Sequence, residues 1–248
     1  MHVYAQEKRK ESKLAETGRV VVQALLIALV IRTLLFQPFN IPSGSMKATL
    51  LVGDYLFVSQ FSYGYTRYSL PFSLPLFSGR IFGSEPKRGD VAVFRLPRDT
   101  STDYIKRVIG LPGDRIQMIG GLLHINGAPV KRESIGDFLD DESGHSIRRW
   151  RETLPNGVSY ETLDLQDNGS LDDTEEYVVP PGHYFMMGDN RDNSLDSRVP
   201  SAVGYVPFEN FVGKAQIIFF SIGDGEPAWH IWSWPWSGRW SRLFTLVR

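Results

Sequence analysis

One apolar run near the N-terminus constrains this chain of 248 residues more than any other feature. Residues 20–36 are interrupted only by Gln23 and Arg32. As a helix they would rise about 25 Å, slightly less than a hydrocarbon core of about 30 Å. Flanking residues can supply the difference, and the long stem of Arg32 can carry its charge toward the interface. The run therefore predicts a transmembrane anchor over residues 20–37.

The same run could instead be a cleaved signal peptide or a buried core helix. It is longer than a usual signal-peptide core, and no convincing Ala-x-Ala-like exit precedes Pro38. We therefore expect a retained anchor. Basic residues come before the run, so residues 1–19 are predicted to be a cytoplasmic tail and the chain after Pro38 to lie on the outer face. These basic residues are Lys8, Arg9, Lys10, Lys13 and Arg19.

Charge and composition exclude several function classes. Apolar residues make up 42% of the chain and aromatic residues 12%, which is enough to fill the core of one large or two modest domains. A net charge of -1 gives no basic field for nucleic acid, so we expect no such partner. The absence of cysteine excludes disulfides, thiolate catalysis and cysteine-bound metals.

Strand signals dominate after the anchor. Alternating or β-branched runs occupy residues 50–58, 90–95, 104–109, 116–119, 122–125, 177–179, 183–187 and 212–222. Gly120-Gly121 between two of these runs predicts a hairpin with a two-residue turn, and Asn126-Gly127 predicts another turn. The pattern predicts a mostly β protein.

Three segments leave alternatives open. Residues 63–82 are rich in aromatic side chains and predict either a loop folded onto the core or an apolar flap on the bilayer surface. Residues 133–176 hold 13 acidic residues against three arginines, which favours a solvated insertion with a charged outer face. Five tryptophans between 229 and 240 could pack on the sheet or lie at a membrane interface.

A polar loop covers residues 188–198, with three Asp, two Asn, two Ser and two Arg. Calcium binding of the EF-hand type is excluded, because Arg191 and Ser194 occupy positions that would need an oxygen ligand and a glycine. The remaining alternatives are a loop bonded to itself or a support for an active site.

The search for a catalytic centre leads to a serine and a lysine. Ser45 follows an extended segment bracketed by Pro38 and Pro42, although a serine beside glycine is usually a turn residue. The five histidines are scattered, and neither a Gly-x-Ser-x-Gly elbow nor a phosphate-binding loop is present. A serine nucleophile then needs another base, such as a neutral lysine. Lys106 in the β-rich run 104–109 is the candidate, its alternative being an exposed cation.

Four motifs in a fixed order support this pair. Ser-Gly-Ser-Met begins at Ser43, Gly-Asp-x-x-x-Val at Gly53, Tyr-Ile-Lys-Arg-Val-Ile-Gly at Tyr104, and Gly-Asp-Asn-Arg-Asp-Asn-Ser at Gly188. Following a membrane anchor, they resemble those of bacterial type I signal peptidases. The resemblance implies a serine endopeptidase of the bacterial inner membrane that needs no cofactor and removes signal peptides from exported preproteins after Ala-x-Ala.

The resemblance also implies an organisation of the chain. A catalytic β domain would comprise residues 38–114 and 184–248, and residues 115–183 would form an inserted, acidic, non-catalytic subdomain. The partners would be signal peptides and the lipid bilayer. Two rival classes are a self-cleaving repressor with the same Ser-Lys chemistry and a non-catalytic β domain on an anchor.

Residue roles follow from the matched motifs. Ser45 matches the nucleophile, Lys106 the general base, Ser43 with the Ser45 N–H the oxyanion hole, and Ser194 the serine that orients the lysine. Structural support is implied for Asp189, Asp196 and Arg198. Shallow substrate pockets are implied for Ile41, Pro42, Met46, Leu50, Tyr104 and Ile105. Ala48 departs from the family pattern, which often has proline there, so the backbone lacks the φ that proline would fix.

Overall fold

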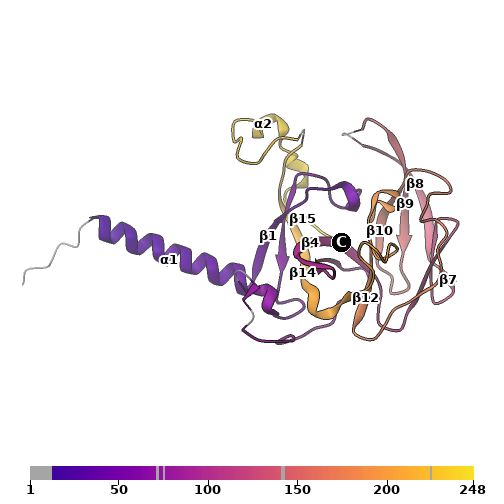
Figure 1. Ribbon diagram of the computed structural model, residues 1–248. Helices are drawn as coiled ribbons and strands as arrows, with labels where there is room; N and C mark the ends of the chain where they lie inside the picture. Colours follow the sequence, from indigo (N-terminus) through magenta and orange to yellow (C-terminus); the bar gives the residue numbers. More distant parts are fainter. Residues whose placement is uncertain (1–12, 71–72, 75, 141–142, 224) are drawn as a thin grey trace, which may run out of the picture.

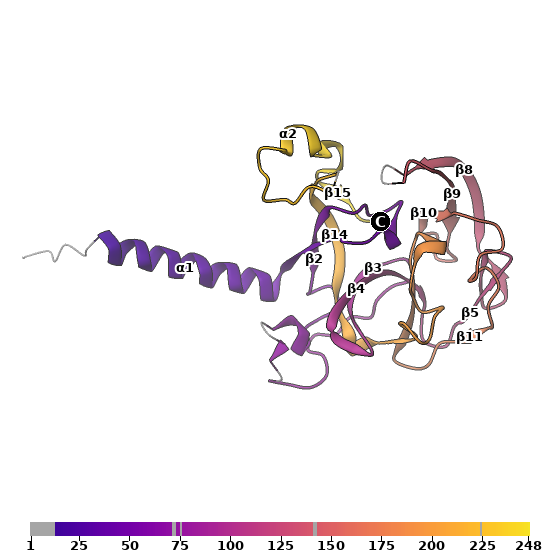
Figure 2. The ribbon, with the colours of Figure 1, turned by 45° about the horizontal axis from the view of Figure 1, so that its top comes forward.

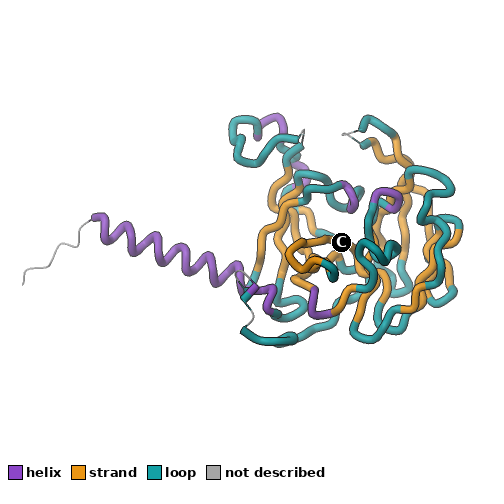
Figure 3. The backbone as a smooth tube through the Cα atoms, in the orientation of Figure 1, coloured by secondary structure: helices purple, strands orange, loops and turns teal. Residues whose placement is uncertain are grey.

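The computed structural model describes residues 13–248 except 71, 72, 75, 141, 142 and 224, and strands dominate it (Figures 1 and 3). The mostly β class with one N-terminal apolar helix is confirmed. The helices are α1 (Lys13–Leu34) and α2 (Trp234–Ser237). The strands are β1 (Phe36–Asn40), β2 (Asp54–Ser59), β3 (Val91–Leu96), β4 (Asp99–Gly110), β5 (Arg115–Ile119), β6 (Leu122–Ile125), β7 (Ala128–Pro129), β8 (Lys131–Leu139), β9 (Ser146–Thr153), β10 (Ser159–Asp164), β11 (Tyr177–Val178), β12 (His183–Met187), β13 (Val206–Pro207), β14 (Phe211–Ser221) and β15 (Thr245–Leu246).

Helix α1 stands away from the β-rich body (Figure 1). Its apolar stretch, Ala15–Leu34, is 20 residues long, and none of its residues is buried. The helix ends at Leu34, before the predicted limit at residue 37, because Phe36 already pairs with Ser59 in an antiparallel ladder. Most of the basic tail lies in residues 1–12, outside the described part.

The largest sheet has eight strands in the order β1-β2-β14-β3-β4-β12-β13, with β15 paired to β14. Strand β4 lies between β3 and β12, so the strand that carries Lys106 adjoins the strand that leads into the polar loop 188–198. Fully buried apolar side chains such as Leu56, Phe94 and Phe211 fill the core against this sheet. The topology thus brings together motifs that are more than 80 residues apart in sequence, as the Arg107–Asp189 bond illustrates.

The predicted hairpin is present as β5 and β6, in a four-stranded sheet of order β11-β5-β6-β7. Ile119 pairs with Leu122, and the two turn residues Gly120 and Gly121 have φ of 54° and 73°. Positive φ at both positions is the geometry of a type I′ turn, which explains the glycine pair.

The acidic segment forms a third sheet, β10-β9-β8, and is not simply a charged outer face. Figure 2 shows β8, β9 and β10 on the side of the body away from α1. The side chains of Glu152, Thr162 and Asp164 are buried in it. The prediction of a solvated face was wrong for these residues. Glu152 pairs with Arg191, 39 residues away in the sequence, and Asp164 with Arg132, 32 residues away, and a local charge count cannot find such pairs.

In each of the two aromatic segments, some side chains pack on the body and others are exposed. In the segment 63–82, Tyr63 and Tyr68 are buried, whereas Leu76 is 73% and Phe82 82% exposed. An isolated bridge between Tyr65 and Ile81 closes this segment into a loop. In the tryptophan tail, the Trp234 ring packs 4.7 Å from that of Phe220. The remaining tail tryptophans, at positions 229, 232, 236 and 240, are exposed.

Candidate active site

Ser45 lies on a short 3-10 turn, Gly44–Met46, that follows an extended segment after β1. Met46 and Leu50 on either side of the following turn are completely buried, and Leu50 N donates to Met46 O at 2.8 Å. These two buried side chains hold the turn against the hydrophobic core. The Ser45 side chain consequently faces a cavity while the residue is only 8% exposed.

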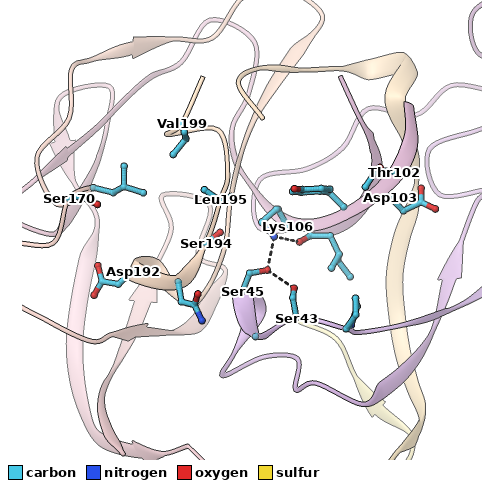
Figure 4. A pocket seen from close by; sticks show the side chains of 16 residues that line it. Ser43, Ser45, Thr102, Asp103, Lys106, Ser170, Asp192, Ser194, Leu195 and Val199 are labelled. Carbon is cyan, nitrogen blue, oxygen red and sulfur yellow. Dashed lines mark hydrogen bonds between the residues drawn. The ribbon is translucent and has the colours of Figure 1, made fainter. Parts of the chain in front are cut away.

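Lys106 reaches the serine from strand β4 (Figure 4). Its Nζ donates to Ser45 Oγ at 2.7 Å and to the main-chain oxygen of Ile105 at 3.0 Å. Burial lowers the pKa of Lys106 from 10.5 to about 8, although the carboxylates of Asp196 and Asp189 act in the opposite direction. A lysine with such a pKa is neutral in a substantial fraction of molecules near neutral to mildly basic pH.

Ser43 is next to the pair but contacts it less closely. Its backbone is extended, with φ of -133° and ψ of 152°, and its Oγ lies 3.4 Å from Ser45 Oγ. This distance is at the outer limit of a hydrogen bond. The Ser43 hydroxyl therefore lies at the cavity and makes only a weak contact with Ser45.

A cavity of about 640 Å³ surrounds these groups. Of the predicted substrate-binding residues, Pro42, Tyr104 and Ile105 line it. The other three, Ile41, Met46 and Leu50, are buried in the hydrophobic cluster beneath the sheet. Extended chain at Pro42 and Ser43 forms one edge of the cavity, and strand β4 from Thr102 to Lys106 forms the other.

The polar loop 188–198 is held by buried ion pairs. Arg107, which strand alternation points away from Lys106, donates to Asp189 at 2.8 and 2.6 Å. Asp196 accepts from Arg198 at 2.9 and 2.8 Å. Burial alone would raise the pKa of Asp196, but the Arg198 guanidinium holds it below its ordinary value. The loop is thus both bonded to itself and tied to β4, which combines the two alternatives drawn from the sequence.

Comparison with known proteins identifies the family. The family described as "Signal peptidase, peptidase S26" matches residues 14–220. This chain belongs to that family. It is 50% identical to the signal peptidase I of Rickettsia conorii over 205 residues, which cover 79% of this chain and 76% of that protein.

A second relative agrees with this assignment. The signal peptidase I of Rickettsia massiliae is 50% identical over 208 residues, or 81% of this chain and 77% of that protein. A crystal structure of a signal peptidase I from Enterococcus faecalis covers 53% of this chain and 97% of its own, at 28% identity and a TM-score of 0.32. The resemblance seen in the motifs is confirmed, and the protein is a serine endopeptidase that removes signal peptides. Both rival classes are excluded.

Ser194 of this signal peptidase is buried and lines the same cavity as Lys106. Among the described residues, no hydrogen bond joins its hydroxyl to Lys106 Nζ, so its role in orienting the lysine stays a prediction. Gly188 packs directly against it. A Cβ on Gly188 would overlap the Ser194 hydroxyl and lie 2.6 Å from Ser45 O, so only glycine lets the loop pass this close to Ser45.

Several lining residues of the peptidase were not predicted. Leu195 and Val199 come from the polar loop and its end, and Ser170 and Leu171 come from the acidic segment. The sequence could have indicated Leu195, because it is the one large apolar residue in the polar run 188–198. In the structure its side chain is exposed. No local pattern marked Ser170 or Leu171, which reach the cavity only through the folding of the acidic segment.

Proposed function

We propose that this signal peptidase works through a Ser45–Lys106 dyad and an acyl-enzyme, and that it cleaves after small residues of the Ala-x-Ala type. The observation that carries the proposal is the 2.7 Å hydrogen bond between Lys106 Nζ and Ser45 Oγ, at two buried residues. A nucleophile within hydrogen-bond reach of a base whose pKa is near the working pH is the arrangement that general-base catalysis needs.

In the first step, the neutral amine of Lys106 accepts the Ser45 proton while Oγ attacks the carbonyl carbon of the scissile peptide. The carbonyl π electrons move to oxygen and give a tetrahedral oxyanion. The Ser43 hydroxyl and the Ser45 N–H are its proposed donors. The cavity edge at Ser43 supports this role, since its Oγ lies 3.4 Å from the attacking oxygen.

In the second step, the Lys106 ammonium gives its proton to the leaving nitrogen, and the C–N bond breaks. The mature protein departs with a free amine, and the signal peptide remains as an ester on Ser45. Lys106 is neutral again and takes a proton from water, whose oxygen attacks the ester. Collapse of this second intermediate breaks the bond to Ser45 Oγ, which takes the proton from Lys106, and releases the signal peptide as a carboxylic acid that loses its remaining proton to solvent.

The two edges of the cavity suit an extended substrate chain. Pro42 and Ser43 on one side and strand β4 on the other offer backbone to a peptide lying between them. The ring of Tyr104 and the branched side chain of Ile105 limit the space beside the catalytic groups. Small side chains at the -1 and -3 positions therefore fit best.

Substitution of the substrate tests this specificity. With the full chain in detergent micelles, a preprotein that carries Ala at -1 and -3 is expected to be cut once, after the -1 residue. Phenylalanine at -1 is expected to lower kcat/KM by about 10²-fold or more, because a bulky side chain is excluded sterically. The cut site is read by mass spectrometry. Phenylalanine at +2 is the control, and equal cleavage of the -1 Phe and Ala substrates would contradict the proposal.

We also propose that the body rests on the outer leaflet. Figure 1 shows α2 and the loops after β2 on the side from which α1 leaves the body. Exposed apolar side chains gather in the loops after β2 and in the C-terminal tail that contains α2: Leu76, Ile81, Phe82, Trp229, Trp232, Trp236 and Phe244. Aromatic rings favour the membrane interface, and the basic residues before α1 favour a cytoplasmic N-terminus.

Quenching by brominated lipids tests the bilayer contact. In nanodiscs, the fluorescence of the full chain is expected to fall when brominated acyl chains replace ordinary ones, because the exposed tail tryptophans would lie within the interface. A variant with Trp229, Trp232 and Trp236 all changed to Ser should lose most of this quenching. Quenching that is equal in the variant and the natural chain would refute the contact.

Protease added outside sealed spheroplasts should digest the body if the proposed orientation is right.

A further inference from the structure

A buried cluster of charged groups joins the sheet β10-β9-β8 to the polar loop 188–198. Arg191 of the loop donates to both carboxylate oxygens of Glu152 on β9, at 2.8 and 2.6 Å. Tyr160 on β10 donates to Glu152 Oε2 at 2.8 Å and accepts from Arg191 Nη2 at 3.0 Å. Glu152 is fully buried, and the other two residues are 5% exposed or less. A bidentate pair in such surroundings fixes geometry as well as distance.

Two more hydrogen bonds hold the loop on either side of Arg191, at Asp189 and Asp192. Leu163 N donates to Asp189 O at 2.9 Å, as part of a parallel bridge between Leu163 and Asn190. One residue after Arg191, the carboxylate of Asp192 accepts from Leu165 N at 2.8 Å. The inserted sheet thus contacts the loop at Asp189 and Arg191, and the residue that follows β10 contacts it at Asp192.

Asn190, enclosed by these contacts, carries the nucleophile turn. Its main-chain N donates to Ser45 O at 3.1 Å, and its side-chain Nδ2 donates to Gly44 O at 3.0 Å. On its other side, the 3-10 turn Arg191–Asn193 leads directly to Ser194 at the cavity. A displacement of Arg191 would therefore move groups on both sides of Ser45.

We propose that Glu152 and Tyr160 are positioning residues for the peptidase reaction. They hold Arg191 and, through it, set the places of Asn190 and Ser194 relative to Ser45. The inserted sheet is then part of the catalytic machinery although none of its three strands supplies a group to the reaction. This inference rests on the proposed Ser45–Lys106 dyad.

A purely structural role makes a different prediction. Glu152→Gln keeps the shape of the side chain but leaves the Arg191 guanidinium buried without its counter-charge, so it should destabilise the fold as well as impair activity. The double variant Glu152→Gln/Arg191→Met removes both charges and should recover much of that stability. If the cluster only stabilises the protein, activity returns with stability. If it positions the loop, activity stays low.

The experiment measures kcat and KM for preprotein cleavage by the full chain in detergent, together with the thermal midpoint of each variant. We expect both the single and the double variant to lower kcat by about tenfold to a hundredfold, with KM changed less than threefold, as small misplacements of catalytic groups do. Tyr160→Phe keeps the ring and removes its bonds to Glu152 and Arg191, and its kcat should fall by a smaller factor.

Glu161→Gln is the matched control. Glu161 lies on β10 next to Tyr160 but pairs with Arg149 at 3.4 Å, away from the loop. Its kcat should stay within about twofold of the natural value, as for surface positions in general. Recovery of kcat in the stable double variant would overturn the proposal. Retained cleavage by Ser45→Ala would instead refute the dyad, so the two failures are distinguishable.

Discussion

Replacement of Ser45 by alanine is expected to lower kcat for preprotein cleavage by about 10⁴-fold or more, because removing the nucleophile of a serine protease leaves only binding and oxyanion contributions. The effect should be large since no other hydroxyl lies as close to Lys106 Nζ as Ser45 Oγ, at 2.7 Å, in the described part of the chain. Single-turnover cleavage of a preprotein by the purified full chain measures the loss.

Two further variants make this test specific. Ser84→Ala, at an exposed position, should keep full activity. Ser45→Ala combined with Lys106→Met should be no slower than Ser45→Ala alone, because groups that act as a unit are strongly non-additive. Cleavage at the same bond by Ser45→Ala at more than a few per cent of the natural rate would contradict the assignment of the nucleophile.

Replacement of Lys106 by methionine is expected to abolish activity to a similar extent and, at the same time, to stabilise the protein. The buried amine has a pKa of about 8 in place of 10.5, which corresponds to about 3 kcal/mol spent on burying its charge at pH 7. Methionine has a similar length without the charge. Thermal unfolding of both proteins at pH 7 measures the gain, and an inactive variant that is less stable would contradict the burial argument.

The pH dependence follows from the same shift. Below pH 8 Lys106 is mostly protonated, so the cleavage rate should rise about tenfold per pH unit and level off above about 8. Because the folded pKa is below the unfolded one, the unfolded chain binds more protons between pH 8 and 10.5. The stability of the natural chain therefore rises relative to Lys106→Met across that window. A cleavage rate that is flat from pH 5.5 to 9 would argue against a lysine base.

Much of the architecture could be predicted from local patterns. The hairpin β5–β6 followed from alternation on either side of Gly120-Gly121, because turn type depends on φ values that few residues adopt. Strand β4 and the opposite directions of Lys106 and Arg107 followed from the period of two. The pairing of Ser45 with Lys106 needed the motifs as a set, since each serine or lysine alone is usually structural.

The remaining features depended on distant partners. Glu152 is 39 residues from Arg191 in the sequence. Thr49 is 140 residues from Asp189, and its hydroxyl donates to the Asp189 carboxylate at 2.5 Å. Nothing local marks such pairs, so acidic residues in 133–176 were interpreted as surface charges. Likewise, Ile41, Met46 and Leu50 carry the same apolar signal whether they line a pocket or fill the core beneath it, where the structure buries them.

The junction between α1 and the sheet has a mechanical consequence. Only Leu35 separates the end of the helix from β1, and the joint is braced because Gln60 donates to Arg32 O at 3.2 Å and Tyr65 OH to Leu34 O at 2.7 Å. A helix inclines to match the thickness of its bilayer. A joint that keeps these bonds would turn the whole body with the helix, and the height of Ser45 above the bilayer would then depend on lipid thickness.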